Sequence, residues 1–480
     1  MINIVKKNYS IFISILMGIF FGYFVVIGGT MMSVITIILF GAIFLSFFVI
    51  LPRPEICLYA VIFFAPLDIY RVVISPGINI SLYRIFLVFA IFIYGLLLIN
   101  KGFKMQKQPL YIFLIFYGMS VIFSFSLTSN FSWAMSVLLA NLSGVIIVYL
   151  MAELLNTKQK IYTAAMVYCF SLVFSVLGAI YILRQFFEGL YVTDIPFRNA
   201  LPFTLASAGH LAARSRFLGF PRFALPLTSP PHLGASLNIG ILFLFCTFIL
   251  YRNQKAKLKN ISVLIFLSLL CLVLLGTFAR SAWIGLLGGG VVILIVEKGR
   301  LLFNKRFWGF SFIVVLVLGM VFFFRIFSPS LVLKRFSPEI TTRTNEYHLE
   351  TRLEALRIAT TNIKNLLFGV GLGNYGLYAP SGGIGSHSVY TTILAERGLF
   401  GLCIFLVLVI SVFFKSRKLL SLSKIKDRWY YCRLGFLSAW VAILLGSLLY
   451  EFFYCKYVWF LLGLVIAGTN VDRVESKVQE

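Results

Sequence analysis

Arginine and histidine are the residues of this chain best suited to bind an anion and move a proton, and they fall at three places. In the segment 187–232 every basic side chain is an arginine or a histidine, and none is a lysine. Arg280 stands in the middle of an apolar run from Ile261 to Val296, and His387 stands between two serines. A guanidinium stays charged and holds phosphate oxygens with a planar fork, while an imidazole exchanges a proton near neutral pH. We therefore predict an anion-binding site with arginine ligands and with His387 as a candidate proton acceptor.

Each candidate also has a structural interpretation that the sequence leaves open. An arginine in the segment 187–232 can pair with Glu188 or Asp194, and Arg280 can cap the carbonyl groups at a helix end. A lone histidine is more often a structural residue with its hydrogen bonds satisfied. His387 is expected on the same side of the membrane as Arg216 and Arg280, which favours a role in catalysis. The sequence does not rank the loop arginines against one another. The candidate anion ligands are Arg214, Arg216, Arg222 and Arg280.

The elements that must position these side chains are membrane-spanning helices. Hydrophobic residues make up 60% of the 480 residues and charged residues only 12%, where a soluble domain carries about 25%. About 20 apolar residues cross a bilayer. We predict an all-α, polytopic bundle of about 12–14 transmembrane helices that forms a single domain over 1–480. The candidate spans are 9–28, 31–51, 56–75, 81–99, 110–127, 133–155, 161–186, 233–251, 261–278, 281–296, 307–327, 388–414, 431–449 and 454–468.

The least secure span is 56–75, because Pro66, Asp68 and Arg71 interrupt it. A short re-entrant element is the alternative for this segment.

The distribution of lysine and arginine predicts the orientation of the bundle. The net charge is +26, and its basic clusters are separated from one another by pairs of spans, so all of them fall on one face. The positive-inside rule makes that face cytoplasmic, with both termini on it. The two long connections, 187–232 and 329–386, are then extracytoplasmic, and loops of that length are typical of functional segments. The clusters are Lys6–Lys7, Lys101–Lys107, Lys158–Lys160, Arg252–Lys259, Lys298–Arg306 and Lys415–Arg428.

The second long connection carries the periodicity of an amphipathic helix. Its apolar positions are Leu349, Leu353, Leu356, Thr360, Ile363 and Leu367, and its remaining faces hold Glu346, Glu350, Arg352, Glu354, Arg357 and Lys364. The pattern does not distinguish a helix on the membrane surface from a packed surface helix. The Gly369–Tyr375 segment that follows has glycine at every second position, which we interpret as a turn that needs positive φ and not as a nucleotide loop.

Four elements in order resemble the O-antigen ligase/polymerase superfamily of bacterial envelope glycosyltransferases. They are Arg216-Phe-Leu-Gly219, the stretch Thr277–Gly290, the turn Gly369–Tyr375, and His387 followed by Glu396-x-Gly398-x-x-Gly401. The resemblance covers about 210–410. This chain departs from the family at Ser388, where an asparagine commonly follows the histidine, so an orienting role for that asparagine is in doubt here.

The resemblance implies a GT-C-like membrane glycosyltransferase in the bacterial inner membrane, with a glycan on undecaprenyl diphosphate as its donor. It implies no metal ion, no nucleotide sugar and no nucleic acid. Arg216 and Arg280 would hold the donor diphosphate, and His387 would act as base on the acceptor hydroxyl.

The acceptor stays open. It is lipid A–core for a ligase, a second lipid-linked repeat unit for a polymerase, and less favoured, a protein. From another functional class, a lipid-linked oligosaccharide flippase or other polytopic transporter is the alternative. Such a transporter predicts charges buried along the spans, whereas Glu153, Arg184, Glu297 and Arg325 sit near span ends.

Overall fold

The computed structural model describes a little over two thirds of the chain. Met1–Ile56 and Cys57–Glu480 form two compact units. The predicted spans 9–28, 31–51 and 307–327 lie outside the described residues. The described residues are 54–67, 71–75, 78–101, 109–187, 216–217, 220–224, 227, 229–250, 257–298, 338–379, 385–422, 426–453 and 455–479.

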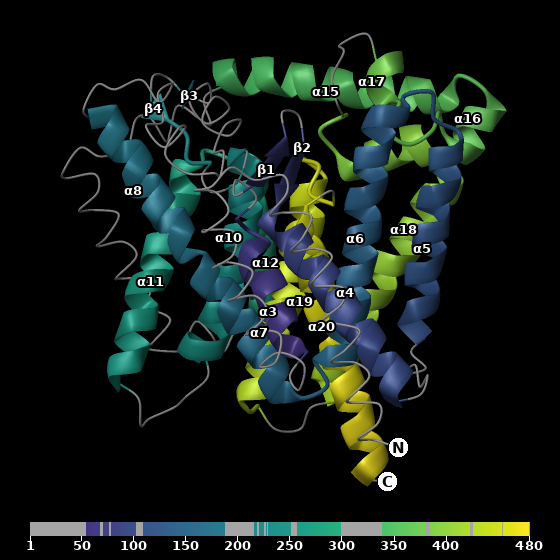
Figure 1. Cartoon of the computed structure of the whole chain (residues 1–480). Coiled ribbons are helices and arrows are strands. Elements are labelled where there is room, and N and C mark those ends of the chain that lie inside the picture. The colour runs from purple at the N-terminus through teal and green to yellow at the C-terminus, as the bar shows by residue number, and fades with distance from the viewer. Residues whose placement is uncertain are drawn as a thin grey trace, which may run out of the picture. The chain divides into compact units, whose positions relative to one another are not determined.

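Long apolar helices run alongside one another through the second unit (Figure 1). Five described helical stretches are long and apolar enough to cross a membrane: Phe131–Leu154, Lys158–Leu183, Pro230–Phe248, Val389–Ser421 and Arg428–Ser447. Shorter apolar helices accompany them, and the predicted all-α, multi-pass membrane fold is confirmed. The helices are α4 (Leu82–Lys101), α5 (Pro109–Ser126), α6 (Phe131–Leu154), α7 (Lys158–Ser171), α8 (Val173–Phe187), α10 (Pro230–Leu244) with the π-helical η2 (Phe245–Leu250), α11 (Lys257–Gly276), α12 (Arg280–Val296), α18 (Val389–Leu422), α19 (Arg428–Ser447) and α20 (Lys456–Gln479).

The segment 56–75 does not form one continuous helix, so its prediction as a full span is wrong. Helix α3 (Glu55–Phe64) ends before Pro66, and the antiparallel strands β1 (Arg71–Ser75) and β2 (Ile78–Ser81) follow. Proline removes a backbone donor, and the run Val72-Val73-Ile74 has the β-branched side chains that suit a strand. A second small hairpin joins β3 (Arg216–Phe217) to β4 (Phe220–Pro221).

Glycines let the central helices approach one another closely. On α12, a Cβ at Gly285 would lie 2.6 Å from the Ala442 carbonyl oxygen of α19, and one at Gly289 would lie 2.8 Å from that of Ser438. Small residues at such positions are characteristic of helix packing in lipid, where van der Waals contact replaces the hydrophobic effect. The start of α12 is therefore held firmly against the end of α19.

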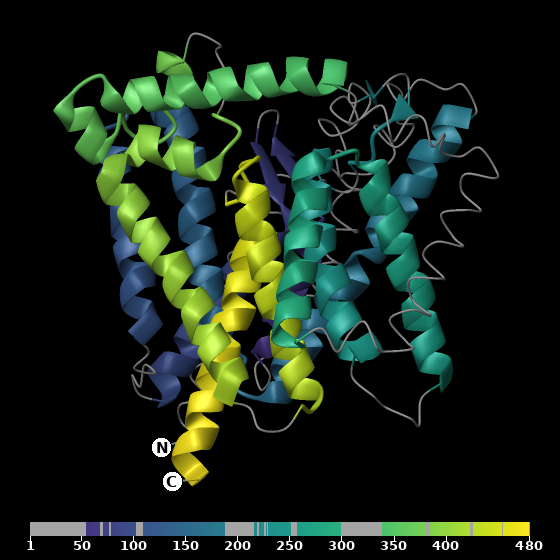
Figure 2. The same cartoon turned by 180° about the vertical axis from the view of Figure 1, so that it is seen from behind.

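Helix α15 (Pro338–Thr360) crosses one end of the spanning helices, as both views show (Figures 1 and 2). It packs through small residues, since Thr351, Ala355 and Ala359 are at most 1% exposed. The leucines of the predicted apolar stripe stay on the outside, and Leu349 is 56% exposed. The short helices α16 (Ile363–Phe368) and α17 (Tyr375–Tyr378) follow. The packed side of α15 thus carries small residues together with Ile358, which is 7% exposed and belongs to a hydrophobic cluster with Val370 and Ala395.

Residues 369–375, here called the glycine turn, join α16 to α17 and lie against α18. Gly369, Gly371 and Gly373 have φ of 77°, 99° and 71°, which confirms the predicted positive-φ turn. The Val370 N–H donates to the Ala395 carbonyl at 2.9 Å, and the Gly371 N–H donates to the Glu396 carbonyl at 3.1 Å. The turn is therefore attached to α18 by main-chain hydrogen bonds.

The side chain of Glu396 completes this attachment. It is 2% exposed, and its carboxylate accepts hydrogen bonds from the backbone N–H groups of Gly373 and Tyr375. Tyr375 in turn donates through its hydroxyl to the Thr351 carbonyl of α15 at 2.8 Å. Glu396 thus holds the turn, and through the turn it holds α15.

Replacing Gly398 with alanine should destabilise the protein. Gly398 kinks α18 with φ 63° and ψ −168°, and a Cβ there would lie 2.3 Å from the Leu367 carbonyl carbon. A side chain in such a backbone region costs roughly 1–3 kcal/mol before any clash is counted. We expect Gly398→Ala to lower the midpoint of thermal unfolding in detergent. Gly118→Ala, where a Cβ meets nothing within 4 Å, is the control. Equal midpoints for the two variants would contradict this account.

Candidate functional site

His387 lies in the loop that enters α18, at the same end of the bundle as α15. Its backbone has φ 56°, a value that non-glycine residues rarely adopt, and its side chain is half-buried. Backbone strain of this kind persists where the surroundings hold it, and it is common at functional sites. The imidazole is surrounded by other rings, namely those of His348 at 4.5 Å, Tyr347 at 5.6 Å and Tyr450 at 5.7 Å between centroids.

Helix α15 contributes two side chains to this site. His348 and Arg352 are four residues apart and therefore lie on one face of the helix. The loop is fixed to the same helix, because the Thr351 hydroxyl donates to the Ser386 carbonyl at 3.2 Å. Burial and the neighbouring Arg352 guanidinium both lower the pKa of His387. The lowered pKa favours the neutral form of the ring, which is the form that can accept a proton.

The loop between α19 and α20, residues 448–455, supports His387 from the other side. The Thr392 hydroxyl donates to the Glu451 carboxylate at 2.5 Å, and the backbone N–H groups of Ser386 and His387 also donate to it. Burial raises the pKa of Glu451 to about 7. Glu451 thus accepts three hydrogen bonds from the segment that carries His387, which makes it a positioning residue for the strained loop.

The end of α19, which leads into this loop, packs against the start of α12. A Cβ at Gly446 would lie 3.2 Å from the Ser281 carbonyl oxygen, so the first turn of α12 packs just before Tyr450. Arg280 is the first residue of α12. Its half-buried guanidinium makes no hydrogen bond or ion pair to the described part of the chain. Arg280 therefore begins α12 beside the end of α19, at the same end of the bundle as His387.

Arg222 has a different environment. Its Nε donates to the Thr277 carbonyl at 2.9 Å, and Nη2 donates to the Phe278 carbonyl at 3.5 Å. The structure therefore gives Arg222 the carbonyl-capping contacts that the sequence had left open for Arg280. By holding the turn between α11 and α12, Arg222 fixes the point from which Arg280 begins.

The remaining sequence candidates are only partly described. The backbone of Arg216 pairs with Pro221 in the β3–β4 hairpin, which leads directly to Arg222. Arg214 lies outside the described residues. The hairpin therefore links one candidate arginine to the α11–α12 turn, and the position of the other is not part of the structure.

Sequence reasoning missed several residues of the site. It placed Arg352 on a polar helix face without a role, and it assigned none to His348, Tyr450 or Glu451. The spacing of His348 and Arg352 was a usable signal, because residues four apart on a helix share a face. A further histidine, His232, lies next to them, with its ring 5.1 Å from that of Tyr450.

Within the described ranges, no group of three or more histidine, cysteine, aspartate or glutamate side chains is arranged to hold a metal ion.

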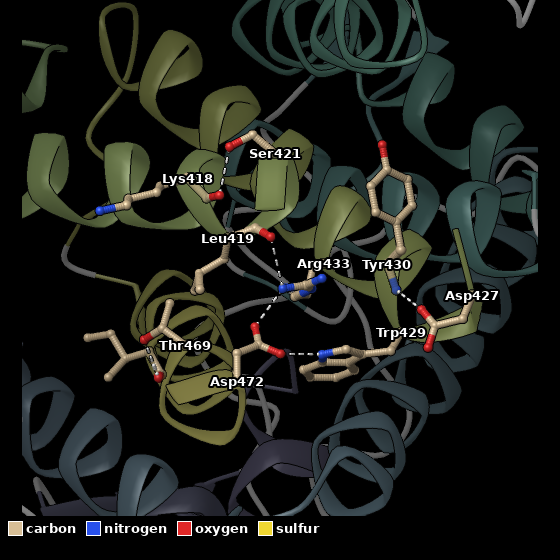
Figure 3. Close-up of polar contacts among 10 residues, drawn as sticks. Lys418, Leu419, Ser421, Asp427, Trp429, Tyr430, Arg433, Thr469 and Asp472 are labelled. Carbon is tan, nitrogen blue, oxygen red and sulfur yellow. Dashed lines mark hydrogen bonds and ion pairs between the residues drawn. The ribbon is translucent and has the colours of Figure 1, made fainter. Parts of the chain in front are cut away.

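Polar contacts at the opposite end of α19 are structural (Figure 3). Arg433 pairs with Asp472 of α20 at 2.6 Å, and the Trp429 indole donates to the other Asp472 oxygen at 2.8 Å. Nearby, Lys426 pairs with Glu297 at 2.6 Å. These ion pairs connect α19 to α20 and the segment before α19 to the end of α12.

Removing the charge of Arg352 should raise the pKa of His387, because a neighbouring cation disfavours the imidazolium. In Arg352→Gln the ring should become protonated at a higher pH than in the wild-type protein, with burial still lowering its pKa. NMR of histidine labelled with ¹³C can follow the titration, and the signal is assigned by its loss in His387→Gln. Arg357→Gln, an exposed change farther along α15, should leave the titration in place. A titration unchanged in Arg352→Gln would show that Arg352 does not act on the ring.

Residues 263–406 match a family model described as O-antigen ligase. This range contains Arg280, α15, the glycine turn and His387. No curated protein matches the chain. The match confirms the resemblance predicted from the sequence over these elements.

Proposed function

We propose that this chain, whose residues 263–406 match the O-antigen ligase family model, is a glycosyltransferase of surface-polysaccharide assembly. Its donor is a glycan carried on undecaprenyl diphosphate, and its acceptor is a hydroxyl group at the extracytoplasmic face of the bacterial inner membrane. The observation that supports this proposal is His387, whose pKa is lowered by burial and by the adjacent Arg352, with Arg280 at the same end of the bundle.

The reaction needs two kinds of group, and the site has both. The bond between the anomeric carbon and the diphosphate oxygen breaks, and undecaprenyl diphosphate leaves with the electron pair. The acceptor oxygen forms the new glycosidic bond, and its proton passes to the His387 imidazole. Arg280 and Arg352 stabilise the charge that develops on the leaving diphosphate, as fixed cations in a partly buried site do. Arg216 and Arg214 remain further candidates for the diphosphate.

The orientation of the protein follows from the proposed chemistry. The end with α15 faces outward, and the end with Arg433 and Asp472 faces the cytoplasm, with both termini on the cytoplasmic side. The basic residues between α18 and α19 support this orientation under the positive-inside rule.

The proposal can be tested directly by a transfer assay with the purified protein in detergent and an undecaprenyl-diphosphate-linked glycan. We expect product without added nucleotide or metal ion. His387→Gln should lower kcat by roughly 10²–10⁴-fold through loss of a general base. Arg280→Gln should lower it by roughly 10²–10³-fold through loss of charge stabilisation. Lys364→Gln, an exposed change on α16, is the control. Full activity in both site variants would refute the assigned roles, and absence of transfer by the wild-type protein would favour a transporter.

The acceptor can be identified in a deletion strain by examining the glycans on the carrier lipid. A ligase transfers finished chains to lipid A–core, so its loss leaves full-length chains on the carrier. A polymerase joins repeat units, so its loss leaves single repeats on the carrier. Chains missing only from protein would indicate protein glycosylation.

The proposed orientation predicts which exposed positions a membrane-impermeant maleimide reaches from outside intact spheroplasts. A cysteine placed at Lys364 of α16 should react, and one placed at Lys418 near the end of α18 should react only after lysis. Both positions are exposed, and the unsubstituted chain is the background control for its own cysteines. Labelling of Lys418→Cys in intact cells would overturn the orientation.

A further inference from the structure

We propose that the cleft between α15, α16 and α17 is a carbohydrate subsite that binds sugar units away from the reacting bond. The proposal rests on the proposed function, since it assigns the cleft to the same glycan. The cleft has a volume of about 800 Å³, within the range of about 300–1,000 Å³ that is usual for ligand sites. It is separate from the histidine site. Its lining consists of Glu350, Leu353, Glu354, Arg357, Ile358, Thr361, Asn362, Asn365 and Tyr378.

The lining has the groups that recognise a sugar. The carboxylates accept hydrogen bonds from sugar hydroxyl groups, and the side-chain amides and the threonine hydroxyl can both donate to them and accept from them. Tyr378 is 54% exposed, so its ring offers an apolar surface for the C–H face of a pyranose together with a phenolic hydroxyl. Leu353 and Ile358 add apolar contact between the polar groups. This mixture differs from the apolar surface that a lipid tail would need.

The charges of the cleft exclude the diphosphate. Two carboxylates, Glu350 and Glu354, face one guanidinium, Arg357, so the lining carries a net charge of −1. A diphosphate would be repelled here, whereas a neutral or amino sugar would be accepted. The histidine site has the opposite character, with Arg352 next to His387 and Arg280 at the same end of the bundle. A lipid-linked glycan therefore has separate places for its diphosphate and for its sugars.

Helix α15 lies between the histidine site and the cleft and contributes side chains to both. His348 and Arg352 point to His387, while Glu350, Glu354 and Arg357 fall on other faces of the helix. Along the axis, Arg352 and Glu354 are only about 3 Å apart, but a helix with its side chains is about 10 Å thick. A glycan that leaves His387 and reaches the cleft must pass around α15. The cleft therefore binds sugar units that lie several units away from the new glycosidic bond.

The walls of the cleft are held in place before a ligand arrives. The Asn365 N–H donates to the Asn362 side-chain oxygen at 2.8 Å, which caps α16. The Tyr375 hydroxyl lies 3.4 Å from the Glu354 carboxylate and fixes α17 beside α15. A preorganised site avoids the entropy of ordering its own loops, which improves affinity.

The cleft is tested by direct binding to the purified full-length protein in detergent. The probe is a set of short oligosaccharides released by mild acid from the cell's own surface polysaccharide, which lack lipid and diphosphate. We expect Tyr378→Ala and Arg357→Gln each to raise the Kd for these oligosaccharides by about tenfold, because each variant loses one favourable contact with the sugar. Lys364→Gln removes the same charge from the outside of α16 and should leave Kd unchanged. His387→Gln should also bind normally. Equal Kd for the wild-type protein and both cleft variants, or no binding at all, would overturn the proposal.

Kinetics then distinguish the source of the glycan. In the transfer assay, the cleft variants should raise one KM by about tenfold and keep kcat within about twofold. A higher KM for the lipid-linked donor assigns the cleft to the donor chain, and a higher KM for the acceptor assigns it to the acceptor. Unchanged KM values for both would refute the subsite even when transfer itself is normal. If the wild-type protein binds the oligosaccharides, the cleft variants weaken that binding, and no glycan is transferred, then the proposed function is refuted while the sugar-binding cleft stands.

Discussion

The buried carboxylate of Glu396 is the constraint on which the functional end of this protein depends. It stands inside α18 and accepts hydrogen bonds from the backbone of Gly373 and Tyr375. An unsatisfied backbone group or an unpaired carboxylate at this depth would be costly, so each partner requires the other. The hydroxyl of Tyr375 donates a hydrogen bond to the Thr351 carbonyl of α15, so α15 is held through the same turn. A helix that crosses the end of the bundle is thereby fixed to a helix that spans it.

The position of α15 has chemical consequences, because it places Arg352 beside His387. A cation next to a half-buried imidazole keeps the ring neutral, and a neutral ring is the form that can act as a base. Glu451 holds the same strained loop from the opposite side, through Thr392 and the main chain. The end of the bundle that carries α15 thus combines an imidazole of lowered pKa with a neighbouring guanidinium, whereas at the other end Arg433 and Asp472 pair with each other.

Much of the fold could be predicted from the sequence. Apolar length alone indicated the spanning helices, and alternating glycines indicated the positive φ of the turn. The failure at 56–75 is instructive, because hydropathy counts Val72 and Ile74 as membrane residues but does not register that β-branched side chains after Pro66 favour a hairpin. Periodicity also predicted a helix at Leu349–Leu356, but not that its small residues would form the packed face.

For the candidate site, the sequence by itself determined the residue types and the side of the membrane on which they are expected. Both follow from span length and charge asymmetry, which are local properties of the chain in a lipid bilayer. It identified His387 and Arg280 in this way. Only the tertiary structure decided that Arg222 caps carbonyl groups, whereas Arg280 makes no such contact with the described residues, and that Arg352 and Glu451 adjoin His387. These relations join residues that are 35 to more than 60 positions apart in the chain. They depend on how closely helices approach one another, which glycines and buried hydrogen bonds set and which no local pattern encodes.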